Sequence, residues 1–167
     1  MIVSAILALD KNNVLGKNNS LPWYIPEDLK LFKNITLNKV LVMGRNTLDS
    51  LPGLLPNREH IVVSKDMDFK VPKGVWGVST LEDALSIATN LTLEKGYDEY
   101  FIIGGGLVVK QLIDKIDKIY LSRVDRYTEI DENTVVLDIL NLGVDFKLVD
   151  KIDYEEFTQE IYVKVKN

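Results

Sequence analysis

The residue whose position most suggests chemistry is Asp28, in a predicted helix. Pro26 suits the first turn of a helix, and the pattern is helical from Glu27, with Leu29 and Phe32 on one face. Asp28 precedes Phe32 by four residues, so its carboxylate points along the edge of the face that a helix normally buries. Two interpretations are open. Asp28 is either a first-turn acid favoured by the helix dipole, or a buried carboxylate that grips a cationic or amide-like ligand group and helps to place a proton.

Three adjacent glycines, Gly104, Gly105 and Gly106, lie between a predicted buried strand and a predicted helix. Glycine lets backbone N–H groups approach a phosphate, and the start of a helix favours negative charge. Val109 occupies the position of the third glycine of a GxGxxG motif, so the triplet is not a dinucleotide-binding fingerprint. A phosphate-binding loop and a tight turn without a ligand both remain open.

Polar residues also follow two other predicted strands. Arg45 begins a segment with Asn46 and Thr47, and Lys65 follows Ser64. A guanidinium group suits a phosphate, and a lysine supplies a second cation. The alternative is a pair of solvated charges at the starts of loops. Because ligands in parallel sheets collect at the carboxyl ends of strands, these segments and the glycine triplet are candidates for one site.

Composition limits the possible functions. The chain has 167 residues, 46% hydrophobic and 27% charged, which predicts one soluble domain spanning 1–167. A net charge of −5 argues against a nucleic-acid partner. Because the chain has no cysteine and one histidine, His60, it excludes disulfides and thiol nucleophiles, and we expect no metal site.

The amino-terminal segment MIVSAILALDK has no basic residues before its apolar run. That run is too short to span a membrane and predicts a strand. We therefore expect a cytoplasmic protein without a membrane partner.

Apolar runs alternate with a helical pattern, which predicts an α/β fold. We expect a single-domain, three-layer fold in which a mostly parallel central sheet ends in an antiparallel carboxy-terminal hairpin. The segment from Leu15 opens with a loop that includes Asn18, Asn19 and Ser20. Ser79 to Glu82 predicts a capping box, Asn90–Asp98 a polar connection and Asp125–Asp138 mostly a loop rich in acids. The predicted strands are Ile2–Leu9, Val40–Met43, Ile61–Val63, Val75–Val78, Tyr100–Ile103, Lys118–Val124, Phe146–Ile152 and Phe157–Val165.

The order of these motifs is familiar. In sequence they are Leu15-Gly16 with Leu21-Pro22-Trp23, then Pro26 to Lys33, Val42 to Thr47, Leu55 to Arg58 with Ile61 to Ser64, Ile102 to Gly106, and Ile119 to Ser122. Along nearly its whole length the chain resembles dihydrofolate reductase of the bacterial type. The resemblance favours the ligand-binding interpretation of Asp28.

The resemblance implies reduction of 7,8-dihydrofolate to tetrahydrofolate, with a hydride from NADPH and a proton at N5 of the pterin. Asp28 would bind the pterin 2-amino group and support that protonation, while Leu21 and Trp23 would belong to a mobile loop over the nicotinamide. Antifolate inhibitors and a monomeric state are also implied. The substrate would contact Ile6, Asp28, Leu29, Phe32, Lys33, Leu51, Leu55, Arg58, Ile103 and Ser122.

The resemblance likewise implies a cofactor site, with a 2′-phosphate between Arg45, Ser64 and Lys65, and a cis peptide bond at Gly104-Gly105. The residues implied to contact NADPH are Ala8, Leu15, Gly16, Gly44, Arg45, Asn46, Thr47, Ser64, Lys65, Ile103, Gly104, Gly105, Gly106, Leu107 and Val108.

Three positions depart from the family pattern. Leu107 replaces a basic or polar residue, which weakens one side of the 2′-phosphate site. The loop Ile130–Val135 is a reduced form of a segment that packs on the mobile loop. Val109 replaces an aromatic residue, and it either lies near the nicotinamide and pterin or belongs to the helix core.

Two rival functions remain from sequence alone. A reductase of the riboflavin pathway shares the fold but does not predict an acid just after Pro22-Trp23. A non-catalytic binding protein with the same fold is the other rival.

Overall fold

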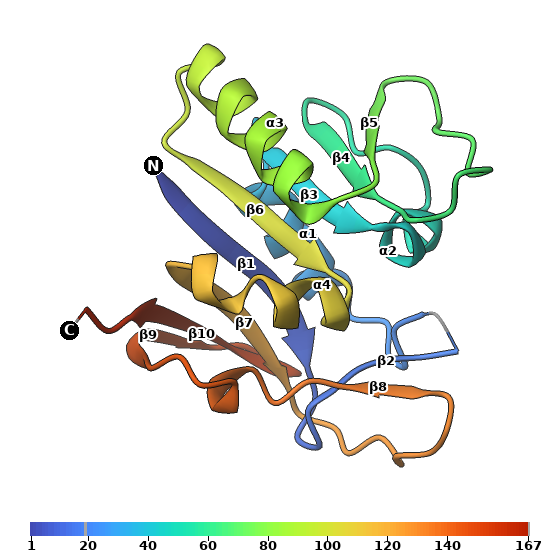
Figure 1. Ribbon diagram of the computed structural model, residues 1–167. Helices are drawn as coiled ribbons and strands as arrows, with labels where there is room; N and C mark the ends of the chain where they lie inside the picture. Colours follow the sequence, from blue (N-terminus) through green and yellow to red (C-terminus); the bar gives the residue numbers. More distant parts are fainter. Residues whose placement is uncertain (19, 167) are drawn as a thin grey trace.

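An eight-stranded sheet forms the centre of the computed structural model, which describes residues 1–18 and 20–166 (Figure 1). Asn19, which belongs to the opening loop in the sequence, lies outside the described residues. The strand order is β5-β4-β3-β6-β1-β7-β10-β9, with parallel pairing from β5 to β7 and antiparallel pairing of β10 with β7 and β9. This arrangement confirms the predicted fold class. The bounds are β1 (Ile2–Leu9), β3 (Val40–Gly44), β4 (Glu59–Val63), β5 (Val75–Val78), β6 (Glu99–Gly104), β7 (Lys118–Val124), β9 (Phe146–Asp153) and β10 (Phe157–Lys164).

Helices cover both faces of the sheet, as the three layers require (Figure 1). Side chains of β1 alternate between the faces. Ala5, Leu7 and Leu9 join the core under α3 and α4, whereas Ile6 joins the core under α1 and α2. Because both faces of the sheet are covered, the sequence of β1 is a nearly unbroken apolar run. The helices are α1 (Pro26–Ile35), α2 (Arg45–Ser50), α3 (Leu81–Glu94) and α4 (Gly106–Gln111), with short 3-10 helices η1 (Ile113–Lys115) and η2 (Ile139–Asn141).

The order in which the chain adds strands to the sheet reverses at its central strands, β1 and β6. After β1 the chain builds β3, β4 and β5 outward, and β6 then returns to pair with both β1 and β3. Connections therefore leave β1 and β6 in opposite directions along the sheet. Such a switch point is where parallel sheets bind ligands, and β3 and β6 end there at Gly44 and Gly104.

Two segments that we expected to be loops form a small antiparallel ribbon. β2 (Val14–Lys17) pairs with β8 (Thr134–Val136), and Lys17 forms an ion pair with Asp131 at 3.1 Å. We expected a loop from Leu15 and mostly a loop over Asp125–Asp138; β2 contradicts the first at its residues, and β8 is a three-residue exception within the second. The strands are short and lie more than a hundred residues apart, so local periodicity carried no signal of their pairing.

The boundaries of α3 also differ from the prediction. The helix continues to Glu94, so the first half of the expected connection Asn90–Asp98 is helical. Leu91 packs against the core and Thr92 is buried, which continues the buried face of the helix. The capping residue is Thr80, whose hydroxyl accepts from the backbone N–H of Asp83 at 3.1 Å, rather than Ser79. None of the described helices is long and apolar enough to cross a membrane.

Asp10 is a buried acid that anchors the ribbon of β2 and β8, and sequence reasoning gave it no role. Its residue exposure is 0%, and its carboxylate accepts backbone hydrogen bonds from Asn12 (2.8 Å), Val14 (3.0 Å) and Thr128 (2.7 Å). Burial by itself would raise the pKa of Asp10, but hydrogen bonds from Thr128, Val14 and Asn12 lower the pKa below its ordinary value. Asp10 thus joins the turn before β2 to the loop before β8.

We expect Asp10→Asn to lower the free energy of unfolding at pH 7 by about 1–3 kcal/mol, because an amide nitrogen would face the N–H of Thr128 or Val14. Since the folded-state pKa is depressed, the carboxylate stabilises the fold above about pH 4, and this contribution is lost as pH falls through the folded pKa. Denaturant titrations at pH 7 and pH 3 measure both effects. If Asp10→Asn lowered the free energy of unfolding equally at the two pH values, the role of the charge would be contradicted.

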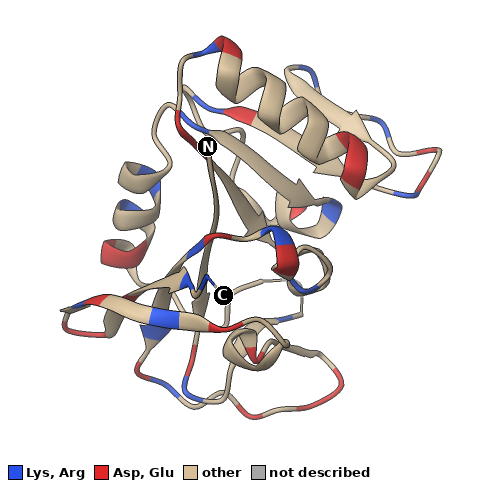
Figure 2. Ribbon diagram, turned by 60° about the vertical axis from the view of Figure 1, so that its left-hand side comes forward, with Lys and Arg blue, Asp and Glu red and all other residues tan. Residues whose placement is uncertain are grey.

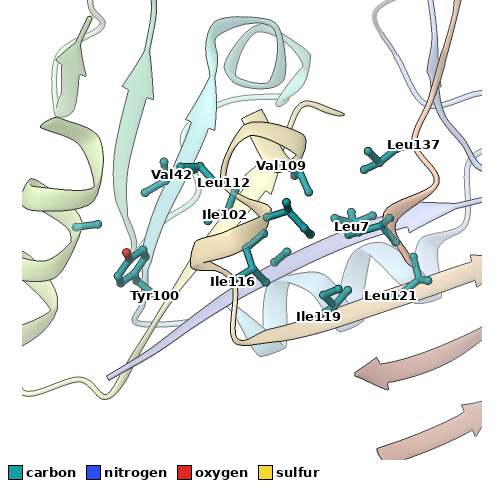
Figure 3. Close-up of a cluster of buried hydrophobic side chains, with 14 of the residues drawn as sticks. Leu7, Val42, Tyr100, Ile102, Val109, Leu112, Ile116, Ile119, Leu121 and Leu137 are labelled. Atoms are coloured by element: carbon teal, nitrogen blue, oxygen red, sulfur yellow. The ribbon is translucent and has the colours of Figure 1, made fainter. Parts of the chain in front are cut away.

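Val109 belongs to the hydrophobic core, which is the second of the two positions that the sequence left open. Its exposure is 0%, and it lies in the cluster that includes Leu7, Ile102 and Leu112 (Figure 3). α4 turns this residue toward the sheet, and turns Leu107, which is 68% exposed, toward solvent. The valine therefore fills the core.

Val109→Tyr should destabilise the protein by about 1–3 kcal/mol, because the added ring cannot fit a filled core without displacing neighbours. The measurement is thermal unfolding of this variant, compared with that of Leu107→Tyr, a substitution on the exposed side of α4. The Leu107 variant should keep the wild-type Tm. An unchanged Tm for Val109→Tyr would place the side chain outside the core.

Candidate active site

The carboxylate of Asp28 is held against the sheet by a serine. The first turn of α1 carries the acids Glu27 and Asp28 (Figure 2), and Asp28 accepts a 2.5 Å hydrogen bond from the hydroxyl of Ser122 in β7. Burial raises the pKa of Asp28, and the bond from Ser122 partly opposes the rise. The site therefore contains a carboxyl group that takes up a proton more readily than an exposed acid.

Apolar side chains line the same face of the sheet around this acid. Ile6, Leu55 and Phe101 are buried there, with the half-buried Phe32, Leu51, Ile103 and Tyr120 packed against them. None of the residues of α1 is fully buried, and Leu29 is 39% exposed. Part of the apolar surface between α1, α2 and the sheet is thus open to a flat apolar ligand.

Trp23 lies in a third cluster, with Ala8 and Leu31 beside it. Ala8 is the register partner of Ser122, so this cluster adjoins the strand position that holds Asp28. The indole is 6% exposed, and its Nε1–H has no acceptor among the described residues. A buried donor of this kind calls for a water molecule or a ligand atom.

Arg58 joins the end of α1 to the segment before β4. Its guanidinium donates to the Thr36 hydroxyl at 3.1 Å and to the backbone carbonyls of Lys33 and Pro56. These bonds fix a planar cation at one end of the apolar surface, where it could bind a carboxylate. Arg58 also lines a cavity of about 270 Å³ with Asn38, Lys39, Asn57, Glu59, Lys95 and Tyr97.

The glycine-rich end of β6 meets the end of β3. A β-carbon added at Gly44 would lie 3.3 Å from Val108 Cγ2 and 3.8 Å from the backbone nitrogen of Gly105. Gly104 has φ of +130°, which side chains rarely tolerate, and Thr47 Oγ1 lies 3.2 Å from where its β-carbon would be. The peptide bond between Gly104 and Gly105 is cis, as the resemblance implied. The absence of side chains lets the ends of β3 and β6 lie close together, and the half-buried Gly44 and Gly105 are where a phosphate-bearing cofactor could approach the backbone.

The ribbon of β2 and β8 lies against the same glycines. A β-carbon at Gly106 would be 3.2 Å from Val135 and 3.4 Å from Leu15. In β2, Gly16 approaches the backbone oxygen of Ser20, the residue before the implied mobile loop. The opening loop and the reduced acidic loop therefore pack together beside the glycine-rich segment.

Arg45 and Ser64 are brought together by a residue that sequence reasoning did not select. The guanidinium of Arg45 contacts Asp66 at 2.7 Å, and Ser64 Oγ accepts from the backbone N–H of Asp66 at 3.2 Å. Phe69 lies under Arg45, with 4.5 Å between the guanidinium carbon and the ring centroid. The signal available in the sequence was the pair of acids Asp66 and Asp68, which follow Lys65 shortly after a strand.

The remaining candidates lie on the surface around these groups. Their side chains are exposed to solvent. They are Leu21, Asn46, Lys65 and Leu107. A second cavity, of about 310 Å³, lies on α3 along Leu85, Ser86, Thr89 and Asn90, away from the candidate residues.

Comparisons with known proteins agree with this geometry. The family model for dihydrofolate reductase matches residues 2–163. Dihydrofolate reductase type 9 of Escherichia coli is 40% identical over 151 residues, covering 90% of this chain and 83% of the relative. Dihydrofolate reductase of Bacillus subtilis is 36% identical over 140 residues, covering 84% and 79%.

A solved structure is similar over almost the entire length. Dihydrofolate reductase from Enterococcus faecalis, complexed with NADP(H) and RAB-propyl, superposes with a TM-score of 0.79 at 30% identity, covering 99% of this chain and 97% of that chain. The known reaction of the matching family is the NADPH-dependent reduction of dihydrofolate. The family model, the relatives and the fold agree, and the chain is a member of the dihydrofolate reductase family.

Proposed function

We propose that this chain reduces dihydrofolate to tetrahydrofolate with NADPH, and that Asp28 is the acid on which the reaction depends. The observation that carries the assignment of Asp28 is its carboxylate, held by Ser122 at the edge of a partly open apolar surface. A family relative bound to NADP(H) supports the choice of cofactor.

Asp28 binds the pterin through hydrogen bonds that its carboxylate accepts from the 2-amino group and the N3 side. Its negative charge, in surroundings of low dielectric constant, favours a proton at N5 of the pterin. Ser122 orients the carboxylate, and Trp23, in the cluster that includes Ala8 of the adjacent strand, offers an Nε1–H donor. The backbone carbonyls of Ile6 and Ile103 complete the polar contacts of the ring.

When bound, NADPH supplies a hydride from C4 of its nicotinamide to C6 of the pterin. The residues that hold it are Ala8 at the carboxamide, Leu15 and Gly16 on the ribbon, and the facing segments 44–47 and 104–108. The observed fit is steric: Gly44 and Gly105, at the two strand ends, are half-buried and have no β-carbon, so a ligand can approach their backbone. Arg45, Ser64 and Lys65 surround the 2′-phosphate.

The segment from Leu21 to Trp23 closes over the reacting groups and excludes water. The hydrogen bonds of the β2–β8 ribbon and of Asp10 hold the base of this segment. Closure thus uses a mobile segment on a rigid base.

The other expectations also stand as proposals: one domain, a monomer in the cytoplasm, inhibition by antifolates, and no partner among nucleic acids or membranes. The apolar run Ile2–Leu9 bears only on the membrane, since it is the central strand β1 rather than a membrane segment.

The Asp28→Asn variant tests the assignment directly. We expect turnover at pH 7 to fall roughly 10²–10⁴-fold, the range for a proton-transfer group. Activity should recover in part at low pH, where the substrate arrives protonated. The measurement is NADPH consumption with dihydrofolate, with the riboflavin precursor as the rival substrate.

Stability and a neighbouring acid provide the controls. A raised folded-state pKa means that stability from Asp28 is present at low pH and lost as pH rises through that pKa, so Asp28→Asn should keep or raise the Tm at pH 7. Glu27→Gln, in the same helical turn, should keep wild-type turnover. Wild-type activity of Asp28→Asn at pH 7 would refute the assignment.

Arg58 should bind the α-carboxylate of the substrate's glutamate as a bidentate pair. Arg58→Lys is expected to raise the KM for dihydrofolate about 10- to 100-fold, because a charged pair of hydrogen bonds is replaced by a point charge. A dihydropterin substrate without the glutamate is the control, and its KM should not change. Equal increases for both substrates would mean that Arg58 acts through the fold, by way of Thr36 and Lys33.

A further inference from the structure

The cation implied for the 2′-phosphate of NADPH is already paired with acids of the chain itself. Arg45 contacts the carboxylate of Asp66 at 2.7 Å and that of Asp49 at 3.8 Å. It also lies over the ring of Phe69. A phosphate that binds Arg45 must share the guanidinium with Asp66 or displace it.

Asp66 is held where it is by its own loop. Its Oδ1 accepts from the backbone N–H of Asp68 at 3.0 Å, its carbonyl accepts from Phe69 N at 3.1 Å, and its N–H binds Ser64 Oγ. The bond from Asp68 and then the bond from Arg45 lower the pKa of Asp66, so the carboxylate is charged at neutral pH. The same turn carries Ser64 and Lys65, so the acid cannot move away without disturbing the implied phosphate site.

This arrangement treats the two nicotinamide cofactors differently. A 2′-phosphate carries negative charge, so at contact distance it repels a carboxylate. The 2′-hydroxyl of NADH can instead donate a hydrogen bond to a carboxylate, which is how many dinucleotide-binding folds recognise that cofactor. Leu107, the position that departs from the family, adds no opposing positive charge.

We propose that Asp66 is a specificity-determining residue that opposes the 2′-phosphate, so that this chain distinguishes NADPH from NADH less strongly than Arg45 and Lys65 alone would allow. The inference rests on the proposed placement of the 2′-phosphate between Arg45, Ser64 and Lys65. It concerns the binding of the cofactor and leaves the chemistry at Asp28 unchanged.

The test is equilibrium binding to purified wild-type protein and to Asp66→Asn. Asparagine removes the charge but keeps an oxygen for the N–H of Asp68. NADPH and adenosine 2′,5′-bisphosphate should each bind about 3- to 10-fold more tightly to the variant, the size of a charge effect at a partly exposed site. NADH and AMP should bind equally or more weakly. The gain should shrink as salt concentration rises.

Asp68→Asn is the matched control, since this neighbouring acid is exposed and lies in the same turn. It should leave every affinity at the wild-type value. A third variant, Arg45→Ala, tests the placement itself and should weaken NADPH without weakening NADH. Melting temperatures show whether each variant folds.

The outcomes separate the two claims. A selective gain for the phosphate-bearing ligands in Asp66→Asn alone supports the proposal. If Arg45→Ala weakens NADPH but Asp66→Asn changes nothing, the role of Asp66 is overturned and the phosphate site stands. If neither variant changes the ratio of the affinities, the placement of the phosphate fails together with the role of Asp66. The role of Asp66 is also overturned if Asp68→Asn binds the phosphate-bearing ligands more tightly to the same extent as Asp66→Asn.

Discussion

The hydrogen bond between Ser122 and Asp28 is the contact on which the site depends. Placing a carboxylate beside apolar side chains costs free energy unless polar groups replace its lost hydration. Here Ser122, from a central strand, donates such a hydrogen bond. The bond also links α1 to β7 of the sheet. The other side of α1 stays open enough for a ligand because none of its residues is fully buried.

A second buried acid supports the opposite side of the site. Asp10 satisfies backbone N–H groups of two loops, which otherwise have few partners, and the β2–β8 ribbon is built on that joint. Asp10 follows the carboxyl end of β1, whereas Asp28 lies on α1 and is bonded to Ser122 of β7, and the surroundings of the two acids have different consequences. Burial dominates at Asp28 and raises its pKa, whereas hydrogen bonds dominate at Asp10 and lower its pKa. Asp28 therefore takes up a proton more readily than Asp10 does.

The departures from the family pattern acquire separate explanations. Val109 fills the core, so its change from an aromatic residue concerns packing. Leu107 is exposed on the other side of α4, so its change concerns the surface that a cofactor would meet. The reduced acidic loop keeps a short strand, which still pairs with the opening segment next to Gly106.

The amino-acid sequence by itself determined the fold class, the strands of the main sheet and the family, because apolar periodicity and ordered motifs such as Pro26 to Lys33 are local signals. It also singled out Asp28, since an acid on an apolar helix face is anomalous within a few residues. Only the tertiary structure decided that Ser122 holds Asp28 and that Asp10 joins two loops. It also decided that β2 pairs with β8, that Val109 faces the core and that Asp66 pairs with Arg45. Most of these depend on contacts between residues far apart in the chain, or on which way a short helix turns. Packing and electrostatics fix such features after the elements have formed, and no local pattern encodes them.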